Sequence, residues 1–108
     1  MTDQNYIVRY LPLFQSELET AVMYIANRLR NPSSAEKLLD DVEKAIQKRL
    51  TNNPEGYEPV MSKKKRDYPY YRIYVGNYII YYVVIHEGGE HIMEVRRFVH
   101  TLQNRDNI

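Results

Sequence analysis

Basic, aromatic and imidazole side chains in the C-terminal half of the chain are types that could act together on a phosphodiester. Residues 60–84 hold a single acid, Asp67, and five basic residues: Lys63, Lys64, Lys65, Arg66 and Arg72. The same stretch holds seven of the eleven tyrosines, namely Tyr68, Tyr70, Tyr71, Tyr74, Tyr78, Tyr81 and Tyr82. Cations bind phosphates and aromatic rings stack on exposed bases, so this pattern is typical of a nucleic-acid surface. The alternative is a solvated loop beside strands that are rich in tyrosine.

Two arginines and one histidine are the candidates for chemistry on a bound phosphate. Arg72 alternates with Tyr70 and Tyr74, which predicts that the three share one face of a strand. Arg96 and Arg97 are consecutive in a later strand, so only one of them can face Arg72. The sequence leaves open which one, because a β-bulge would reverse the assignment.

These residues suggest a hypothetical ribonuclease site, in which arginines stabilise added negative charge and a neutral imidazole moves the proton of a 2′-hydroxyl. Its catalytic part consists of Arg72, Arg97 and His100. Its RNA-binding part consists of Lys63, Lys64, Lys65, Arg66, Tyr74 and Arg96. The alternative is that Arg96 pairs with Glu94 or Glu90 and that His100 is a solvated residue at a strand end.

The segment from His86 to His91 contains two imidazoles and two carboxylates within six residues, a composition that could bind a metal ion. The pair Gly88-Gly89 between two strand patterns indicates a hairpin turn instead, because glycines would break the helix that zinc-binding histidines need. We therefore predict no metal site and no cofactor. Glu17 is interpreted as an ordinary acid in the first turns of a helix.

Apolar periodicity predicts the elements that position these residues. Residues 4–11 predict a strand, and Pro12 suits the start of a helix that runs to about Arg30. Ser33 and Glu36 form a capping-box pattern at the start of a second helix that ends near residue 50. Residues 55–69 predict an irregular connection, and strands over 70–75, 78–85 and 91–99 follow it, separated by turns.

The resulting order βααβββ predicts an α+β fold. The simplest arrangement is an antiparallel sheet with the N-terminal helical hairpin packed on one face and the other face open to a ligand or partner. A length of 108 residues leaves room for one domain, residues 1–108. The chain has no cysteine, a formal charge of +1 and no apolar run of about 20 residues, so we expect a cytoplasmic protein without membrane contact.

Three segments resemble the RelE/ParE superfamily of type II toxins: residues 71–84 (YRIYVGNYIIYYVV), residues 92–100 (IMEVRRFVH) and residues 6–12 (YIVRYLP). The resemblance covers nearly the whole chain. It implies a small growth-inhibiting toxin that is neutralised by a cognate antitoxin protein. Arg72 matches a basic position on the first hairpin strand, and either Arg96 or Arg97 matches the basic residue of the last strand.

The superfamily has two branches. One is a metal-independent endoribonuclease that cuts mRNA in the ribosome, and the other inhibits DNA gyrase without cutting RNA. Nuclease members often carry arginine where this chain has Ile79, so this position counts against the nuclease branch. Two helices of about five turns are also closer to the gyrase branch. The basic patch and the tyrosines, in contrast, favour binding of RNA. The sequence-based prediction leans towards mRNA cleavage, with the ribosome and mRNA as partners; the alternatives are inhibition of gyrase and an inactive module that only binds the antitoxin.

Overall fold

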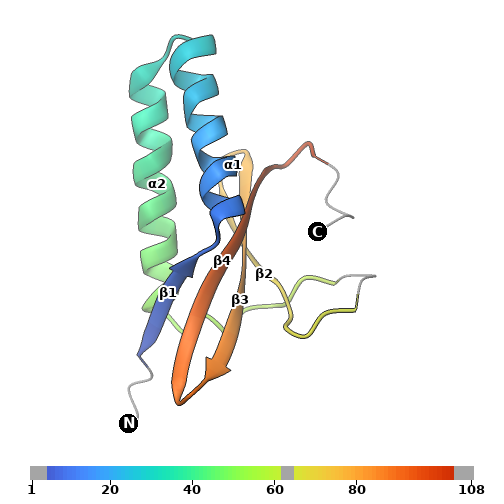
Figure 1. Cartoon of the computed structure of the whole chain (residues 1–108). Coiled ribbons are helices and arrows are strands. Elements are labelled where there is room, and N and C mark those ends of the chain that lie inside the picture. The colour runs from blue at the N-terminus through green and yellow to red at the C-terminus, as the bar shows by residue number, and fades with distance from the viewer. Residues whose placement is uncertain (1–4, 62–64, 104–108) are drawn as a thin grey trace.

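The chain folds into a four-stranded sheet with a helical hairpin packed on one face (Figure 1). The computed structural model describes residues 5–61 and 65–103. In chain order the elements are β1 (Tyr6–Tyr10), α1 (Pro12–Met23), a π-helical turn η1 (Tyr24–Arg28), α2 (Pro32–Leu50), β2 (Tyr71–Val75), β3 (Tyr78–Glu87) and β4 (Glu90–His100). The predicted α+β class and the order βααβββ are confirmed. No helix within the described ranges is long and apolar enough to cross a membrane.

The sheet is mixed rather than wholly antiparallel, which corrects one detail of the prediction. Its strand order is β1-β4-β3-β2, and β1 lies parallel to β4 with Tyr6 opposite His91 and Tyr10 opposite Val95. The two helices return the chain to the end of the sheet where β1 starts (Figure 1). The antiparallel meander of β2, β3 and β4 then gives β4 the direction of β1. β1 and β2 are therefore the two edge strands.

The start of α2 differs from the prediction by two residues. The helix begins at Pro32, and its N-cap is Asn31, whose Oδ1 accepts a hydrogen bond from the backbone N–H of Ser34 at 3.2 Å. Proline is well suited to a first helical position, because its missing N–H would have no partner within the helix. Ser33 lies inside the helix and donates from Oγ to Asn31 Oδ1 at 3.1 Å. The capping box predicted for Ser33 and Glu36 is therefore wrong.

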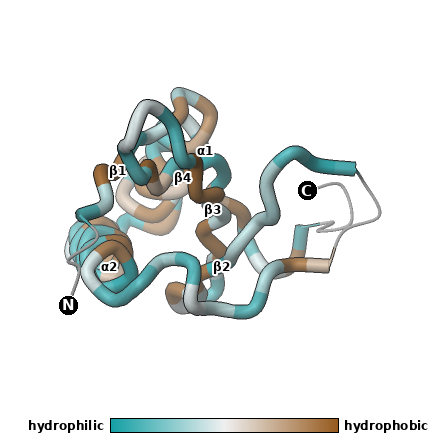
Figure 2. Tube along the Cα trace, turned by 90° about the horizontal axis from the view of Figure 1, so that it is seen from below, coloured by the Kyte–Doolittle hydropathy of each residue, from teal (hydrophilic) through white to brown (hydrophobic). Residues whose placement is uncertain are grey.

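The main core lies between the helices and one face of the sheet. In Figure 2, brown apolar segments of the strands and helices face one another across this layer. The helices contribute Phe14, Leu38, Val42 and Ile46. The sheet contributes Tyr71, Ile73, Val75, Ile80, Tyr82, Val84, Met93, Val95 and Phe98. Burial of these apolar side chains is the main force that holds the hairpin on the sheet.

The opposite face of the sheet is less open than predicted. Ile79, Tyr81 and Val83 of β3 are almost completely buried there, and Tyr70 and Val60 from the connection after α2 pack against this second cluster. The amide of Val60 also donates to the carbonyl of Tyr70 at 2.7 Å. In Figure 2 the connection runs from α2 past β2 to the side of the sheet away from that helix. Strand β3 is consequently buried on both faces.

A buried tyrosine joins α2, the connection and the sheet. The hydroxyl of Tyr82 donates to the carbonyl of Pro54 at 2.7 Å and accepts from Nη1 of Arg49 at 2.9 Å. The same Nη1 donates to the carbonyl of Arg72 at 3.2 Å, and the guanidinium stacks 3.5 Å from the ring centre of Tyr57. Burial raises the pKa of Tyr82 to about 12, although its hydrogen bond with Arg49 acts in the opposite direction. The network therefore keeps a neutral phenol inside the fold.

Replacing Tyr82 with Phe should lower the free energy of unfolding by about 1 to 3 kcal/mol, because Pro54 and Arg49 each lose a partner at a buried position. Urea denaturation followed by circular dichroism measures this change. Tyr74→Phe is the matched control, since the side chain of Tyr74 is 55% exposed and its hydroxyl should contribute less than about 0.5 kcal/mol. Equal stability of the two variants would contradict the role given to the Tyr82 hydroxyl.

The same tyrosine should make the protein sensitive to alkali. Its pKa is higher in the folded chain than the ordinary value of 10.0, so the stabilising contribution is complete below about pH 10 and is lost as the pH rises towards about 12. Between these two pH values, the free energy of unfolding should fall by about 2 to 3 kcal/mol more in wild type than in Tyr82→Phe. The stability difference between the two proteins should therefore narrow with rising pH, and a constant difference would exclude this explanation.

Candidate functional site

A β-bulge in β4 decides the placement of the two consecutive arginines. In the register of β3 and β4, Tyr81 lies opposite Arg97 and Tyr82 lies opposite Val95, so Arg96 is an extra residue without its own partner. A bulge of this kind shifts the alternation of side chains by one residue. Within β4, the side chains before the bulge and those after it therefore alternate between the two faces of the sheet in opposite phase.

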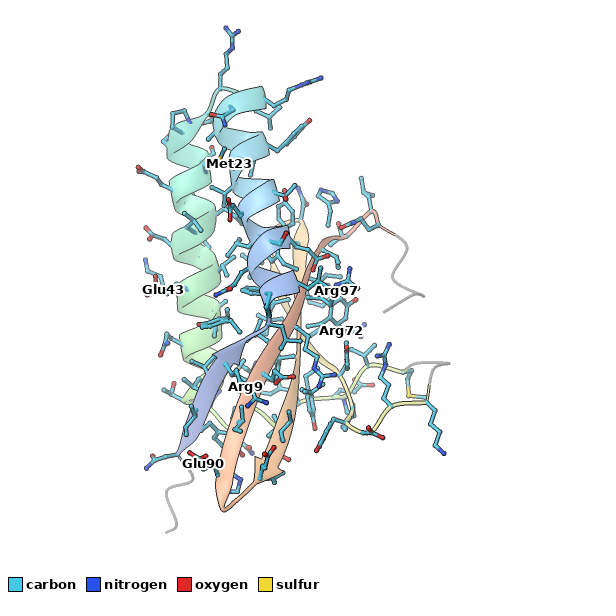
Figure 3. All side chains as sticks on the ribbon, in the orientation of Figure 1. Arg9, Met23, Glu43, Arg72, Glu90 and Arg97 are labelled. Carbon is cyan, nitrogen blue, oxygen red and sulfur yellow. The ribbon has the colours of Figure 1, made fainter. Side chains whose placement is uncertain are left out.

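Arg72 and Arg97 lie in one row across the face of the sheet that is opposite the helices. Both are register partners of Tyr81, Arg72 on β2 and Arg97 on β4. Two steps between neighbouring strands put their Cα atoms about 10 Å apart. Figure 3 shows both side chains beside the strands, whereas Met23 and Glu43 lie on the helices. The structure thus brings together two of the three residues predicted to be catalytic.

Arg97 is not available as an isolated cation. Its Nε and Nη2 donate to the carboxylate of Glu17 on α1 at 3.0 and 2.7 Å, and the same carboxylate accepts from the backbone N–H of Phe98 at 2.9 Å. The hydrogen bond with Glu17 raises the pKa of Arg97 despite the opposing effect of burial. Glu17 therefore joins α1 to β4, which is more than the ordinary helix acid predicted from the sequence.

A second carboxylate on the same face, that of Glu94, pairs with two further arginines. Glu94 is 5% exposed, and its two oxygens accept from Nε of Arg9 at 2.7 Å and from Nε of Arg96 at 2.8 Å. Burial alone would raise the pKa of Glu94, but the hydrogen bonds and charges of the two arginines outweigh it, so this pKa lies below the ordinary value. The pairing of Arg96 with Glu94, weighed above as an alternative, is present.

Arg9 and Glu17 are the site residues that sequence reasoning missed, and Glu94 was considered only as an alternative partner of Arg96. Glu94 carried a usable signal, because a carboxylate flanked by apolar residues in a predicted strand must find a cation when it is buried. Arg9 gave a weaker signal as the one basic residue of the first strand. The bond of Arg9 with Glu94 spans 85 residues and that of Glu17 with Arg97 spans 80, so no local pattern could predict these two pairs.

Arg72 and Tyr74 form the most accessible part of the face. Both side chains are exposed on β2, and the Arg72 guanidinium lies 5.7 Å from the ring centre of Tyr74. Among the described residues, no carboxylate forms an ion pair with Arg72. The predicted sharing of one face by Arg72, Tyr74 and Tyr70 is confirmed by the burial of the alternating residues of β2 in the main core.

The predicted RNA-binding residues next to β2 are only partly described. Lys63 and Lys64 lie outside the described residues, and Lys65 is exposed. The guanidinium of Arg66 stacks 4.1 Å from the ring centre of Tyr70. The guanidinium of Arg96 lies 5.8 Å from the centre of the same ring. Tyr70 therefore gathers two of the cations assigned to RNA binding.

His100 lies on the other face of the sheet. It is the register partner of Tyr78, whose ring packs against the helix-side core and contacts the imidazole edge-on at 5.1 Å. Nδ1 of His100 accepts from the backbone N–H of Leu102 at 3.1 Å. The imidazole lines a cleft of about 390 Å³ between α1 and the end of the sheet. The sheet therefore separates His100 from Arg72, whereas Glu17, the partner of Arg97, lines the same cleft as His100. The three predicted catalytic residues do not all meet in one site.

The helical hairpin has apolar surface available to a protein partner. A groove of about 520 Å³ runs between α1 and α2. Its apolar lining comprises Tyr10, Phe14, Leu18, Leu39, Val42 and Ile46. Leu13 and Met23 on α1 are about half exposed outside this groove. Exposed apolar surface of this kind is typical of a protein interaction site.

Replacing Glu94 with Gln should lower the free energy of unfolding by about 1 to 2 kcal/mol at neutral pH, because two partly exposed arginines lose their charged acceptor. The pKa of Glu94 is lower in the folded chain than its ordinary value of 4.5, so its contribution is present above that value and is lost as the pH falls through the folded pKa. Thermal unfolding between about pH 3 and 7 should thus show a smaller acid-induced loss for Glu94→Gln than for wild type. Glu36→Gln on the exposed surface of α2 is the control, and the same acid response in all three proteins would refute the assignment.

Comparison with known proteins identifies the family of this fold and site. The family described as the ParE toxin of the type II toxin-antitoxin system, parDE, matches residues 8–105. A search of curated proteins found no match. The match runs from β1 through β4 and includes both helices, the paired carboxylates and the arginines of the sheet. The chain therefore belongs to the ParE toxin family of type II toxin-antitoxin systems.

Proposed function

We propose that this toxin stops growth by binding DNA gyrase and not by cutting mRNA. A type II toxin has a cognate antitoxin as its partner, and the target is the open question. The observation that carries the proposal is the separation of His100 from Arg72, which lie on opposite faces of the sheet. A ribonuclease needs its proton-transfer group and its phosphate-binding cations on the same bound phosphate.

The state of the arginines also favours binding over RNA cleavage. Glu17 neutralises Arg97, and Glu94 is shared by Arg9 and Arg96. Phosphate binding is driven by unpaired cations that release counterions from the nucleic acid. Arg72 is the described arginine of this face that keeps its charge uncompensated by an ion pair. The RNA-binding roles predicted for Lys63, Lys64, Lys65, Arg66, Tyr74 and Arg96 stay predictions.

Ile79 gives a third argument. Nuclease relatives often carry arginine at this position, as the resemblance implies. Here the side chain has 0% exposure and packs in the second cluster with Tyr81 and Val99. A guanidinium at this depth would need a partner to offset its desolvation. The local packing is therefore built for an apolar residue and supports the gyrase branch.

Purified toxin should inhibit supercoiling of relaxed plasmid by gyrase, with inhibition that rises with the ratio of toxin to enzyme. In parallel, primer extension on an mRNA translated in a cell-free system should show intact message with and without ribosomes. Cuts within codons that require ribosomes, from a preparation that leaves supercoiling unaffected, would overturn the proposal and restore the nuclease interpretation.

Variants separate the two mechanisms further. His100→Ala should retain full inhibition of gyrase, since its imidazole has no part in a binding mechanism. Met23→Glu should weaken inhibition about tenfold if the exposed apolar surface of α1 contacts the enzyme. Met61→Glu is the matched control, because this methionine is 92% exposed on the connection far from α1 in sequence. Loss of inhibition in Met61→Glu with retention in Met23→Glu would move the interface to the connection.

A further inference from the structure

Two histidines face each other at the tip of the β3–β4 hairpin. Gly88 and Gly89 have positive φ values of 58° and 79°, a conformation that glycine adopts easily, and they close a tight turn between the strands. The turn places His86 directly opposite His91 in the register. The two rings are nearly perpendicular, at 79°, with centres 4.6 Å apart. The hairpin turn predicted from the sequence is therefore also the feature that brings the imidazoles together.

The contact between these rings is shorter than an ordinary hydrogen bond. Nδ1 of His86 and Nδ1 of His91 are 2.5 Å apart, whereas N···N or N···O hydrogen bonds are usually about 2.7 to 3.2 Å. Two bare lone pairs, or two N–H groups, would repel each other at this distance. The two nitrogen atoms are therefore placed to share one proton or one cation.

A carboxylate fixes the orientation of the first ring. Nε2 of His86 donates to Oε1 of Glu55 at 2.8 Å, and Oε1 also accepts from the hydroxyl of Tyr6 at 3.1 Å. A neutral imidazole with its proton on Nε2 presents a lone pair at Nδ1, which points at His91. A carboxylate that orients a ligand imidazole in this way is a common outer partner at metal sites. The ring of His91 packs 5.5 Å from that of Tyr6.

The sequence predicted a hairpin turn and no metal site in this segment, and the facing imidazoles change the second expectation. We propose that His86 and His91 form a binding site for a divalent transition-metal ion such as Zn²⁺, Ni²⁺ or Cu²⁺, held by the two Nδ1 atoms. Bonds of about 2.0 to 2.1 Å at angles of about 90° to 110° put two ligand nitrogens about 2.9 to 3.4 Å apart. The rings would need to separate by about 0.4 to 0.9 Å. His86 is exposed and His91 is partly exposed. On binding, the ion replaces the proton between the rings, and that proton moves to Nε2 of His91.

The site supplies two protein ligands. Within residues 5–61 and 65–103, no group of three or more His, Asp or Glu side chains is arranged to hold a metal ion. Water therefore completes the coordination, as it does in open metal sites. Imidazole ligands and an open shell favour Cu²⁺ over Ni²⁺ and Zn²⁺ in affinity. The side chain of His86 is 49% exposed, which gives an ion direct access.

The effect of the ion follows from the three segments that meet there. His86 and His91 belong to the hairpin, Glu55 to the connection and Tyr6 to β1. An ion that fixes the hairpin tip also strengthens the bond from His86 to Glu55, because metal binding polarises the imidazole N–H. The ion should therefore raise thermal stability, since it binds only when the hairpin has formed. The inference does not depend on the target of the toxin.

The test is calorimetric titration of the metal-free full chain with ZnCl₂ and, separately, CuSO₄ at neutral pH. We expect one ion per chain and a melting temperature that rises with ion concentration. His91→Ala should lose at least tenfold in affinity, and Glu55→Gln should lose about 10 to 100-fold while keeping the stoichiometry. His100→Ala is the matched control, because it removes the third histidine and leaves the pair intact.

A second measurement makes the result independent of how the variants fold. Imidazole NMR signals of wild-type protein should shift for His86 and His91 when the ion is added, and those of His100 should stay in place. The proposal is overturned by the absence of binding at millimolar ion. Unchanged affinity in a folded His91→Ala variant, or shifts confined to His100, would overturn it as well.

Discussion

One extra residue in β4 governs the distribution of side chains over the two faces of this protein. Without the bulge at Arg96, strict alternation would place Phe98 and His100 on the same face as Glu94. With the bulge, Phe98 enters the helix-side core, where its ring stacks on Tyr78 at 4.7 Å. Arg97 moves to the opposite face, next to Tyr81. The packing of α1 and the composition of the basic face are thus both consequences of a single backbone irregularity.

The two faces are also unequal in how they reach solvent. The helix side is closed by a hairpin, and the other side is partly covered by the connection through Tyr70 and Val60. Ion pairs hold the borders of this second face, with Glu17 at the α1 end and Glu94 near β1. A sheet closed on both sides leaves β2 and the outer surfaces of the helices as the principal accessible regions. A toxin that acts by protein contact can use such regions without a catalytic cavity.

The fold could be predicted largely from the sequence, because it rests on local signals. Apolar periodicity located both helices, and Gly76-Asn77 and Gly88-Gly89 marked the two hairpin turns. The error at the start of α2 was also local, since Asn31 and Ser33 both have capping side chains and Pro32 decided between them. The arrangement of the site was less predictable. The bulge has no signature in the pattern of Arg96 and Arg97, and the bonds of Arg9 with Glu94 and of Glu17 with Arg97 join residues that only the tertiary fold brings together.

The hydrogen bonds that enter β2 from outside the sheet have a further consequence. A free edge strand presents unpaired carbonyls that invite another chain to add a strand. Here the outward carbonyl of Tyr70 accepts from Val60, and that of Arg72 accepts from Arg49. These carbonyl groups at the start of β2 are thus already hydrogen-bonded to donors of the same chain. A strand from another chain could therefore pair with the first half of β2 only by displacing the bonds from Val60 and Arg49.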